Sequence, residues 1–276
     1  MIDPTDHDRV IAANREAWDQ SAPLHRDGPE WARYLEGFKT PGYSCLDAIA
    51  TQRLKAIGIE GRSVAQICCN NGREILSVKN LGAGRCVGFD QSAGFLAQAR
   101  DLAAAGGIEC AFVEGDANRI DAAYDGAFER VLITIGVFGW MPDLNRFLGV
   151  AARLLAPDGV LCVYEQHPIM QMMEPWEEPD PARLTHSYFK GEPFIDEGPI
   201  LYDDSKPSPG AVQYWFPHKL SDILTACLKA GLTLEAFEEF PHNISSAAFD
   251  IYANQPAQLP QSYWLTARKQ TTGAAR

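Results

Sequence analysis

Between residues 60 and 168, short apolar runs alternate with segments whose apolar residues recur at helical spacing. The apolar runs, which predict strands, cover residues 63–68, 85–89, 109–113, 129–135 and 160–164. The helical segments between them cover residues 72–81, 92–105 and 142–155. The last apolar run has no polar break, which is typical of a strand buried on both faces. This alternation predicts an α/β fold with a doubly wound, mostly parallel sheet.

Three helical patterns precede this region, at residues 7–20, 30–37 and 44–57. Residues 168–217 follow it, hold nine prolines and show little periodicity. Long loops of this kind within compact domains tend to be functional. A helix at 218–230 and strands at 232–240 and 263–267 complete the pattern. We therefore predict four parts: an N-terminal helical cap (1–60), a ligand-binding core (61–167), a lid insertion (168–217) and a C-terminal part of the core (218–276).

The charge and the cysteines of the chain exclude several classes of function. The 276 residues carry a net charge of −12 without a long basic cluster, whereas nucleic acid binding needs a positive surface. The first residues lack the features of a secretory signal, and no apolar run approaches the roughly 20 residues of a membrane span. The seven cysteines show no C-x-x-C pair and no metal-ligand spacing. We expect a cytoplasmic protein without a nucleic acid or membrane partner, a metal site or a disulfide framework.

The most informative chemistry lies in Val64-Ala-Gln-Ile-Cys-Cys-Asn-Asn-Gly72, which is followed eighteen residues later by Asp90. A strand leads here into a turn of small and polar residues, and the next strand ends on a carboxylate. A β-α-β unit of this kind binds adenosine-containing ligands, because the acid at the second strand tip holds the ribose hydroxyls. Cys68 and Asn70 stand where a dinucleotide fingerprint has glycines, so pyrophosphate has no glycine cradle. An adenosine ligand without phosphates fits better, and S-adenosylmethionine (SAM) is such a ligand.

Four pieces of the chain, in family order, resemble the class I SAM-dependent methyltransferases over roughly residues 60–168 and 218–269. They are the turn 68–72, Asp90, Gly115-Asp116-Ala117 after the third strand, and Leu154-Leu-Ala-Pro-Asp-Gly159 before the fifth. Residues 134–144, 167–168 and 218–223 further resemble a bacterial subgroup that acts on small molecules. The resemblance implies a Rossmann-like sheet whose last strand is antiparallel, SAM as cofactor, and a small-molecule methyl acceptor.

The resemblance also implies roles for single residues. Asp90 would accept hydrogen bonds from the ribose hydroxyls. Asp116 would accept from the adenine amino group, while the backbone N–H of Ala117 donates to the ring. No acid occupies position 66, where the wider family faces the SAM ammonium with a carboxylate, so backbone carbonyls or Asn70 would have to replace it. The other implied cofactor residues are Cys68, Gly72, Gln91, Thr134 and Ile135.

Methyl transfer mainly requires alignment of the acceptor with the methyl group, and a base is needed only if the acceptor arrives protonated. Glu165 and His167, just past the fifth strand, are the candidate catalytic residues. A loop histidine that is solvated or bonded to backbone is the alternative for His167. Aromatic and histidine side chains are candidates for the acceptor pocket, although core packing is the alternative role for each: Trp18, His25, Tyr34, Trp140, Tyr202 and His218.

Three functions are compatible with this sequence. The first is a methyltransferase that modifies an O, N or C nucleophile of a small molecule. The second is an enzyme on the same fold that binds SAM but performs other chemistry, which the altered turn at 68–72 permits. The third is a non-catalytic SAM-binding protein, against which the intact Asp90 and Asp116 argue. The sequence leaves open whether the protein forms a homodimer.

Overall fold

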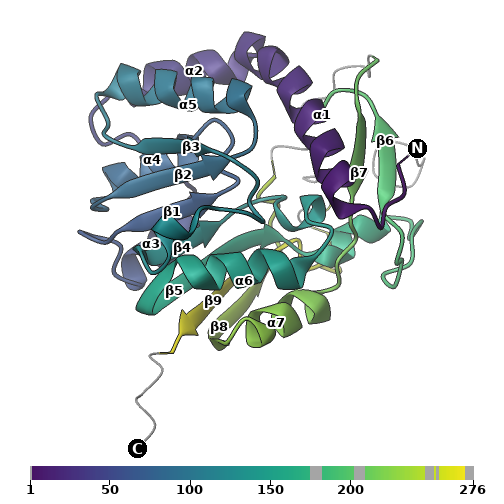
Figure 1. The fold of residues 1–276 in the computed structure, drawn as a ribbon. Coiled ribbons are helices and arrows are strands. Elements are labelled where there is room, and N and C mark those ends of the chain that lie inside the picture. Colours follow the sequence, from purple (N-terminus) through teal and green to yellow (C-terminus); the bar gives the residue numbers. More distant parts are fainter. Residues whose placement is uncertain (1, 175–181, 202–208, 246–251, 253–254, 271–276) are drawn as a thin grey trace, which may run out of the picture.

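A seven-stranded sheet forms the centre of the protein in the computed structural model, which describes residues 2–174, 182–201, 209–245, 252 and 255–270 (Figure 1). The strand order is β3-β2-β1-β4-β5-β9-β8. β9 runs antiparallel to both of its neighbours, and the pairs formed among β1 to β5 are parallel. This confirms the predicted doubly wound sheet with an antiparallel last strand. The strands are β1 (Val64–Ile67), β2 (Cys86–Asp90), β3 (Ala111–Glu114), β4 (Phe128–Ile133), β5 (Leu155–Gln166), β8 (Leu232–Phe240) and β9 (Ser262–Lys269).

Helices cover both faces of the sheet, so that alternate residues of one strand enter different apolar clusters. Val64 packs in a cluster with Leu54 of α3 and Ile75 of α4, whereas its neighbour Ala65 packs in the cluster that holds Phe147 of α6. This period of two is the strand geometry that the apolar runs predict for a sheet buried on both sides. The helices are α3 (Ala48–Ala56), α4 (Arg73–Asn80) and α5 (Ala93–Gly106) on the first face, and α6 (Leu144–Leu154) and α7 (Leu220–Lys229) on the second.

Several boundaries differ from the sequence prediction for local reasons. The first helix, α1 (His7–Asp27), continues beyond residue 20 through Pro23 and ends at Gly28, where α2 (Pro29–Phe38) begins. α3 begins at Ala48 rather than at 44, because the Asp47 side chain accepts a hydrogen bond from the Ala50 N–H at 2.7 Å and caps the helix. β5 begins at Leu155 rather than at 160, since the chain pairs with β4 before its turn at 157–159.

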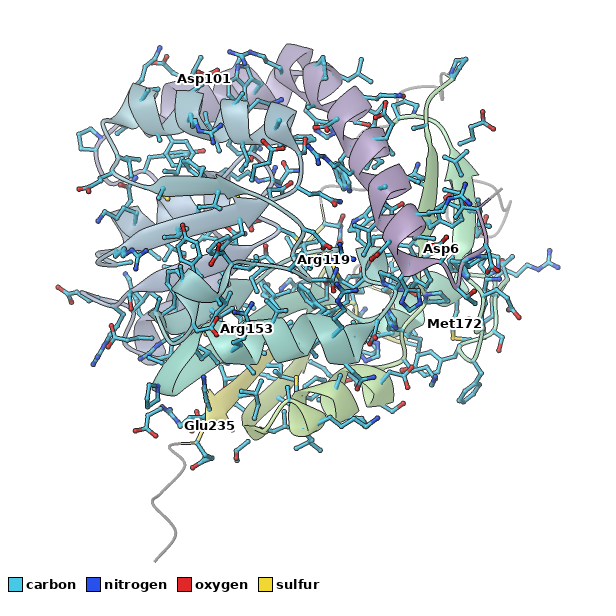
Figure 2. The ribbon with its side chains drawn as sticks, in the orientation of Figure 1. Asp6, Asp101, Arg119, Arg153, Met172 and Glu235 are labelled. Atoms are coloured by element: carbon cyan, nitrogen blue, oxygen red, sulfur yellow. The ribbon has the colours of Figure 1, made fainter. Side chains whose placement is uncertain are left out.

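The helix α1 lies beside the carboxyl ends of the central strands (Figure 1). Near its start, Asp8 forms an ion pair with Arg119, which follows β3 and is labelled in Figure 2. Further along, Asp19 accepts a hydrogen bond at 2.6 Å from the Ser92 hydroxyl, which precedes α5. These contacts fix α1 against the edge of the sheet at which parallel α/β proteins bind their ligands.

A two-stranded antiparallel ribbon, β6 (Phe194–Glu197) and β7 (Val212–Trp215), packs on the other side of α1. The Asn14 amide of α1 bonds the Tyr214 backbone in both directions, at 2.7 and 2.9 Å. Short 3₁₀ turns occur at η1 (Ala122–Tyr124), η2 (Phe138–Trp140) and η3 (Pro168–Met172). The described part of the proline-rich region therefore lies at the carboxyl edge of the sheet. Among the described residues, no helix is both long and apolar enough to cross a membrane.

Phe147 tests whether the α6 face of the sheet is the stabilising core. Its side chain is fully buried and packs edge-on against Phe138 at a ring distance of 6.1 Å. We expect Phe147→Ala to lower the free energy of unfolding by about 3–5 kcal/mol, because truncation of a buried phenylalanine leaves a cavity. Phe189 is 78% exposed, so the control Phe189→Ala should change it by less than about 0.5 kcal/mol. Urea unfolding followed by circular dichroism measures both, and equal effects would contradict this core assignment.

Candidate functional site at the carboxyl ends of β1, β2 and β4

The turn between β1 and α4 keeps a backbone path that normally requires glycine. Cys68 and Asn70 have φ angles of +57° and +50°, and Gly72 has +71°, so all three lie in the left-handed region. A side chain at Gly72 would also collide, since its Cβ would lie 2.7 Å from Phe112 Cε1 and 2.8 Å from Ala99 Cβ. The backbone thus keeps the conformation of a glycine-rich turn, although Cys68 and Asn70 stand at two positions that favour glycine.

Asp90 lies at the tip of β2 and faces this turn. Its Oδ2 accepts a hydrogen bond from the Asn70 N–H at 2.8 Å, and its Oδ1 accepts from the Ser92 N–H at 2.9 Å. Burial raises the pKa of the Asp90 carboxyl to about 6, against the opposing effect of these backbone donors. The carboxylate is therefore held at the place where the sequence predicts a ribose partner.

Asp116 and Ala117 follow β3. The Gly115 N–H donates a hydrogen bond to the Asp90 carbonyl at 2.9 Å, which ties the end of β3 to the end of β2. Asp116 Oδ1 accepts from the Asn118 N–H at 2.8 Å, and Oδ2 lies 3.6 Å from Arg119 Nε. Asp116 thus shapes its own turn and stands at the strand end next to Asp90. Both predicted acids and their neighbours Gln91 and Ala117 lie at one edge of the sheet, as the sequence predicts.

Glu74, which the sequence analysis missed, supplies a carboxylate beside β1. Gln66 is buried on β1 and donates from Nε2 to Glu74 Oε2 at 2.7 Å and to Thr134 Oγ1 at 2.9 Å. The Thr134 hydroxyl donates to the same Glu74 oxygen at 2.5 Å. Position 66 lacks an acid, yet the first turn of α4 brings one to it. The sequence feature that could have revealed this carboxylate is the position of Glu74, two residues after Gly72 and thus in the first turn of the next helix.

Two adjoining cavities open beside these residues. The smaller, of about 60 Å³, is lined by predicted cofactor residues together with Glu74: Cys68, Asn70, Thr134 and Ile135. The larger, of about 230 Å³, has the predicted pocket residue Tyr34 in its wall. Arg73, Glu74, Thr134, Ile135 and Ser245 line both. The structure therefore brings the turn after β1, the end of β4 and Tyr34 together around two neighbouring cavities with shared walls.

Glu165 holds the loop that follows β4. Its Oε1 accepts from the N–H groups of Gly136 and Gln166 at 2.5 and 2.7 Å, and its Oε2 accepts from Val137 and Phe138 at 2.9 and 3.4 Å. Burial raises the pKa of the Glu165 carboxyl to about 7, although these four donors oppose the shift. Because both oxygens are bonded to backbone, this arrangement argues against the predicted role of Glu165 as an acid–base catalyst.

His167 is buried and faces β8 rather than the two cavities. Its Nε2 lies 3.0 Å from Glu239 Oε1, and its Nδ1 accepts from the Ile169 N–H at 3.2 Å. Burial lowers the pKa of His167, while the neighbouring Glu239 acts in the opposite direction. His167 lines neither of the two cavities beside Thr134. Its placement is that of a packed histidine and argues against the predicted catalytic role.

The other predicted acceptor residues belong mainly to packed contacts around α1. Trp18 packs edge-on against Trp140 at 5.2 Å, and Trp140 in turn packs against Trp215 at 5.0 Å. His25 Nε2 lies 2.8 Å from the Ile200 carbonyl, and His218 Nε2 lies 2.6 Å from that of Met141. Tyr202 falls outside the described residues. The structure places Tyr34 at the cavity and Trp18 and Trp140 in an aromatic wall between α1, η2 and β7.

Comparisons with known proteins agree with this geometry. Residues 64–159 match a family described as "Methyltransferase domain". A demethylmenaquinone methyltransferase of Thermus thermophilus is 36% identical over 108 residues, which are 39% of this chain and 48% of that protein. The chain thus spans about half the length of this curated relative.

Solved structures share the fold at low sequence identity. A SAM-dependent methyltransferase from Mesorhizobium loti has a TM-score of 0.53 and 17% identity, covering 79% of this chain and 96% of that one. The 1,6-didemethyltoxoflavin-N1-methyltransferase of Burkholderia thailandensis, solved with S-adenosylhomocysteine, has a TM-score of 0.57 and 16% identity, covering 98% and 92%. Residues 64–159 are therefore similar to a methyltransferase domain, and the chain shares the fold of these solved SAM-dependent methyltransferases.

Proposed function

We propose that this protein transfers a methyl group from SAM to an O, N or C atom of a small molecule. The observation that carries the proposal is Asp90, held at the strand tip beside a left-handed turn. This pair of features suits an adenosine ligand without a phosphate cradle. The matched domain covers residues 64–159 only, so the acceptor of the Thermus relative is not carried over to this chain.

The residues around the turn fit SAM. Asp90 would hold the ribose, and Asp116 with the backbone of Ala117 would hold the adenine. Gln66 Oε1 is buried without a hydrogen-bond partner among the described residues, and it lies on the same side chain that contacts Glu74. An ammonium group bound in the smaller cavity would pair with the Glu74 carboxylate, which lines that cavity. We infer that Glu74 replaces the missing acid of position 66.

When bound, SAM supplies a methyl group on a sulfonium: an acceptor lone pair bonds to the methyl carbon, the C–S electron pair stays on sulfur, and any acceptor proton passes to water. The protein has to hold the two reactants about 3–3.5 Å apart and in line. Glu165 contributes by fixing the loop after β4, which begins with Thr134 and Ile135. We propose that positioning, rather than a base at Glu165 or His167, provides the catalysis, with the β6–β7 ribbon and α1 as the cover.

A second function, other chemistry on bound SAM, is favoured by one observation. Cys68 and Asn70 carry side chains where the family has glycine, and both line the smaller cavity. SAM binding without methyl transfer to a broad panel of acceptors would support this alternative.

Glu74 and Asp90 can be tested together by calorimetric titration with SAM. We expect Glu74→Gln and Asp90→Asn each to weaken SAM binding by roughly tenfold to several-hundredfold, because hydrogen bonds to charged groups contribute about 1.5–3 kcal/mol each. Asp101→Asn on α5, which removes an exposed ion pair with Arg26, is the matched control and should bind as wild type does. Wild-type protein should not bind NAD. Unchanged SAM affinity in folded variants would refute these two roles.

Glu165 should also make the stability of the protein depend on pH. Its pKa is raised from an ordinary 4.5 to about 7, so the folded state binds the proton more tightly. The stability linked to this proton is therefore full below pH 4.5 and is lost as pH rises to 7. The loss amounts to about 3 kcal/mol, since one pKa unit corresponds to about 1.4 kcal/mol.

Unfolding of wild type and Glu165→Gln at pH 4.5 to 8 measures this effect as a difference between two curves. Asp90, whose pKa is also raised, contributes equally to both proteins and cancels. The variant should show a flatter dependence whatever its absolute stability. Parallel curves would mean that Glu165 is ionised throughout this range.

A further inference from the structure

The larger cavity lies between the sheet and the helices α2 and α3. Its walls include Tyr34 of α2, Leu54 of α3, and Leu132, Tyr164 and Trp264 from β4, β5 and β9. Tyr164 and Trp264 are 4% and 2% exposed, so their rings present fixed surfaces to the cavity. Tyr34 is fixed as well, because the guanidinium groups of Arg33 and Arg73 lie 4.8 and 5.2 Å from its ring centre. The cavity thus has fixed aromatic surfaces, and charged side chains also line it: Glu30, Arg33, Asp47, Arg73 and Glu74.

A chain of polar groups ends in this wall. The Tyr164 hydroxyl lies 2.8 Å from Asp47 Oδ2 and 2.9 Å from His242 Nε2. Because a hydroxyl has one proton to donate, and Asp47 can only accept, His242 is the donor to Tyr164 oxygen in this arrangement. Burial, followed by the nearby Asp47, raises the pKa of Tyr164, so the hydroxyl stays neutral. Its oxygen keeps a lone pair for a ligand hydroxyl.

The opposite part of the cavity meets the cofactor site. Arg73, Glu74, Thr134, Ile135 and Ser245 line both cavities, and Glu74 and Thr134 are hydrogen-bonded to each other. A molecule in the larger cavity therefore reaches the methionine part of SAM at this shared wall. Its far end reaches Tyr164.

We propose that the larger cavity binds the methyl acceptor, and that the acceptor is a single aromatic ring with two hydroxyl groups. This proposal rests on the proposed function and names its substrate class. The cavity volume of about 230 Å³ is below the roughly 300–1,000 Å³ of pockets for drug-sized ligands, which favours a small acceptor. One ring packs between Tyr34 and Trp264. One hydroxyl bonds Tyr164, and the other takes the methyl group at Glu74 and Thr134.

Binding of hydroquinone to the full-length protein saturated with S-adenosylhomocysteine tests the proposal by calorimetry. We expect hydroquinone to bind, and 1,4-cyclohexanediol to bind at least tenfold more weakly, because cyclohexanediol lacks the aromatic faces. Equal binding of the two compounds, or no binding of hydroquinone, would overturn the substrate class.

Two variants locate the binding to this cavity. Tyr164→Phe removes one neutral hydrogen bond and should weaken hydroquinone about 3- to 10-fold. The control is Tyr124→Phe, because the Tyr124 ring stacks on Phe128 outside the cavity walls. This variant should bind hydroquinone as tightly as the wild-type protein does. Ala50→Leu projects into the cavity and should abolish hydroquinone binding.

The affinity for S-adenosylhomocysteine separates this proposal from the one on which it rests. It should stay unchanged in all three variants. If Ala50→Leu or Tyr164→Phe lowers it instead, the cavity holds part of the cofactor and the acceptor assignment is wrong, while the methyltransferase proposal stands. If the wild-type protein does not bind S-adenosylhomocysteine, the proposed function fails first.

Discussion

The half-buried carboxylate of Glu74 makes the hydrogen bonds around which the site is organised. One oxygen of Glu74 accepts from both Gln66 and Thr134, so a single carboxylate joins α4, β1 and β4 at the carboxyl edge of the sheet. Partial burial of a carboxylate costs free energy unless hydrogen-bond donors replace water, and the Gln66 and Thr134 side chains are such donors. The Gln66 carbonyl oxygen is buried without a hydrogen-bond partner among the described residues. The Glu74 carboxylate lines both cavities, and this is the basis of the ammonium contact proposed for it.

The turn after β1 imposes a second constraint, since two of its residues adopt a conformation that favours glycine. Holding Cys68 and Asn70 in the left-handed region costs on the order of 1 kcal/mol each. The Asp90 carboxylate offsets part of this cost, because it accepts the Asn70 N–H released by the turn. Asp90 therefore shapes the turn, in addition to the ribose contact proposed for it. Two of the three described non-glycine residues with positive φ therefore lie at this turn, and the third, Asp158, lies in the turn within β5.

The sequence predicts the strands, the sheet and the acids at the strand tips, because each follows from periodicity or from position at a strand end. It does not predict which face a residue past a strand will take. Val163 packs on the α6 side of the sheet and Cys162 on the α3 side. Glu165 and His167 therefore fall on the α6 side, while Tyr164 falls on the α3 side. Sequence reasoning placed the catalytic candidates at the correct edge but could not assign the face. Glu74 escaped for a related reason, since helical spacing does not reveal a side chain that reaches back to the preceding strand.

The two faces of β5 divide the work of positioning between them. From one face Glu165 holds the backbone of the loop after β4, and from the other Tyr164 lines the larger cavity. Because the two residues are adjacent, a shift of β5 moves the cofactor loop and the cavity wall together. Antiparallel pairing with β9 along residues 160–166 resists such a shift. Since methyl transfer depends on the alignment of two reactants, one rigid strand that sets the walls for both suits a reaction driven by position.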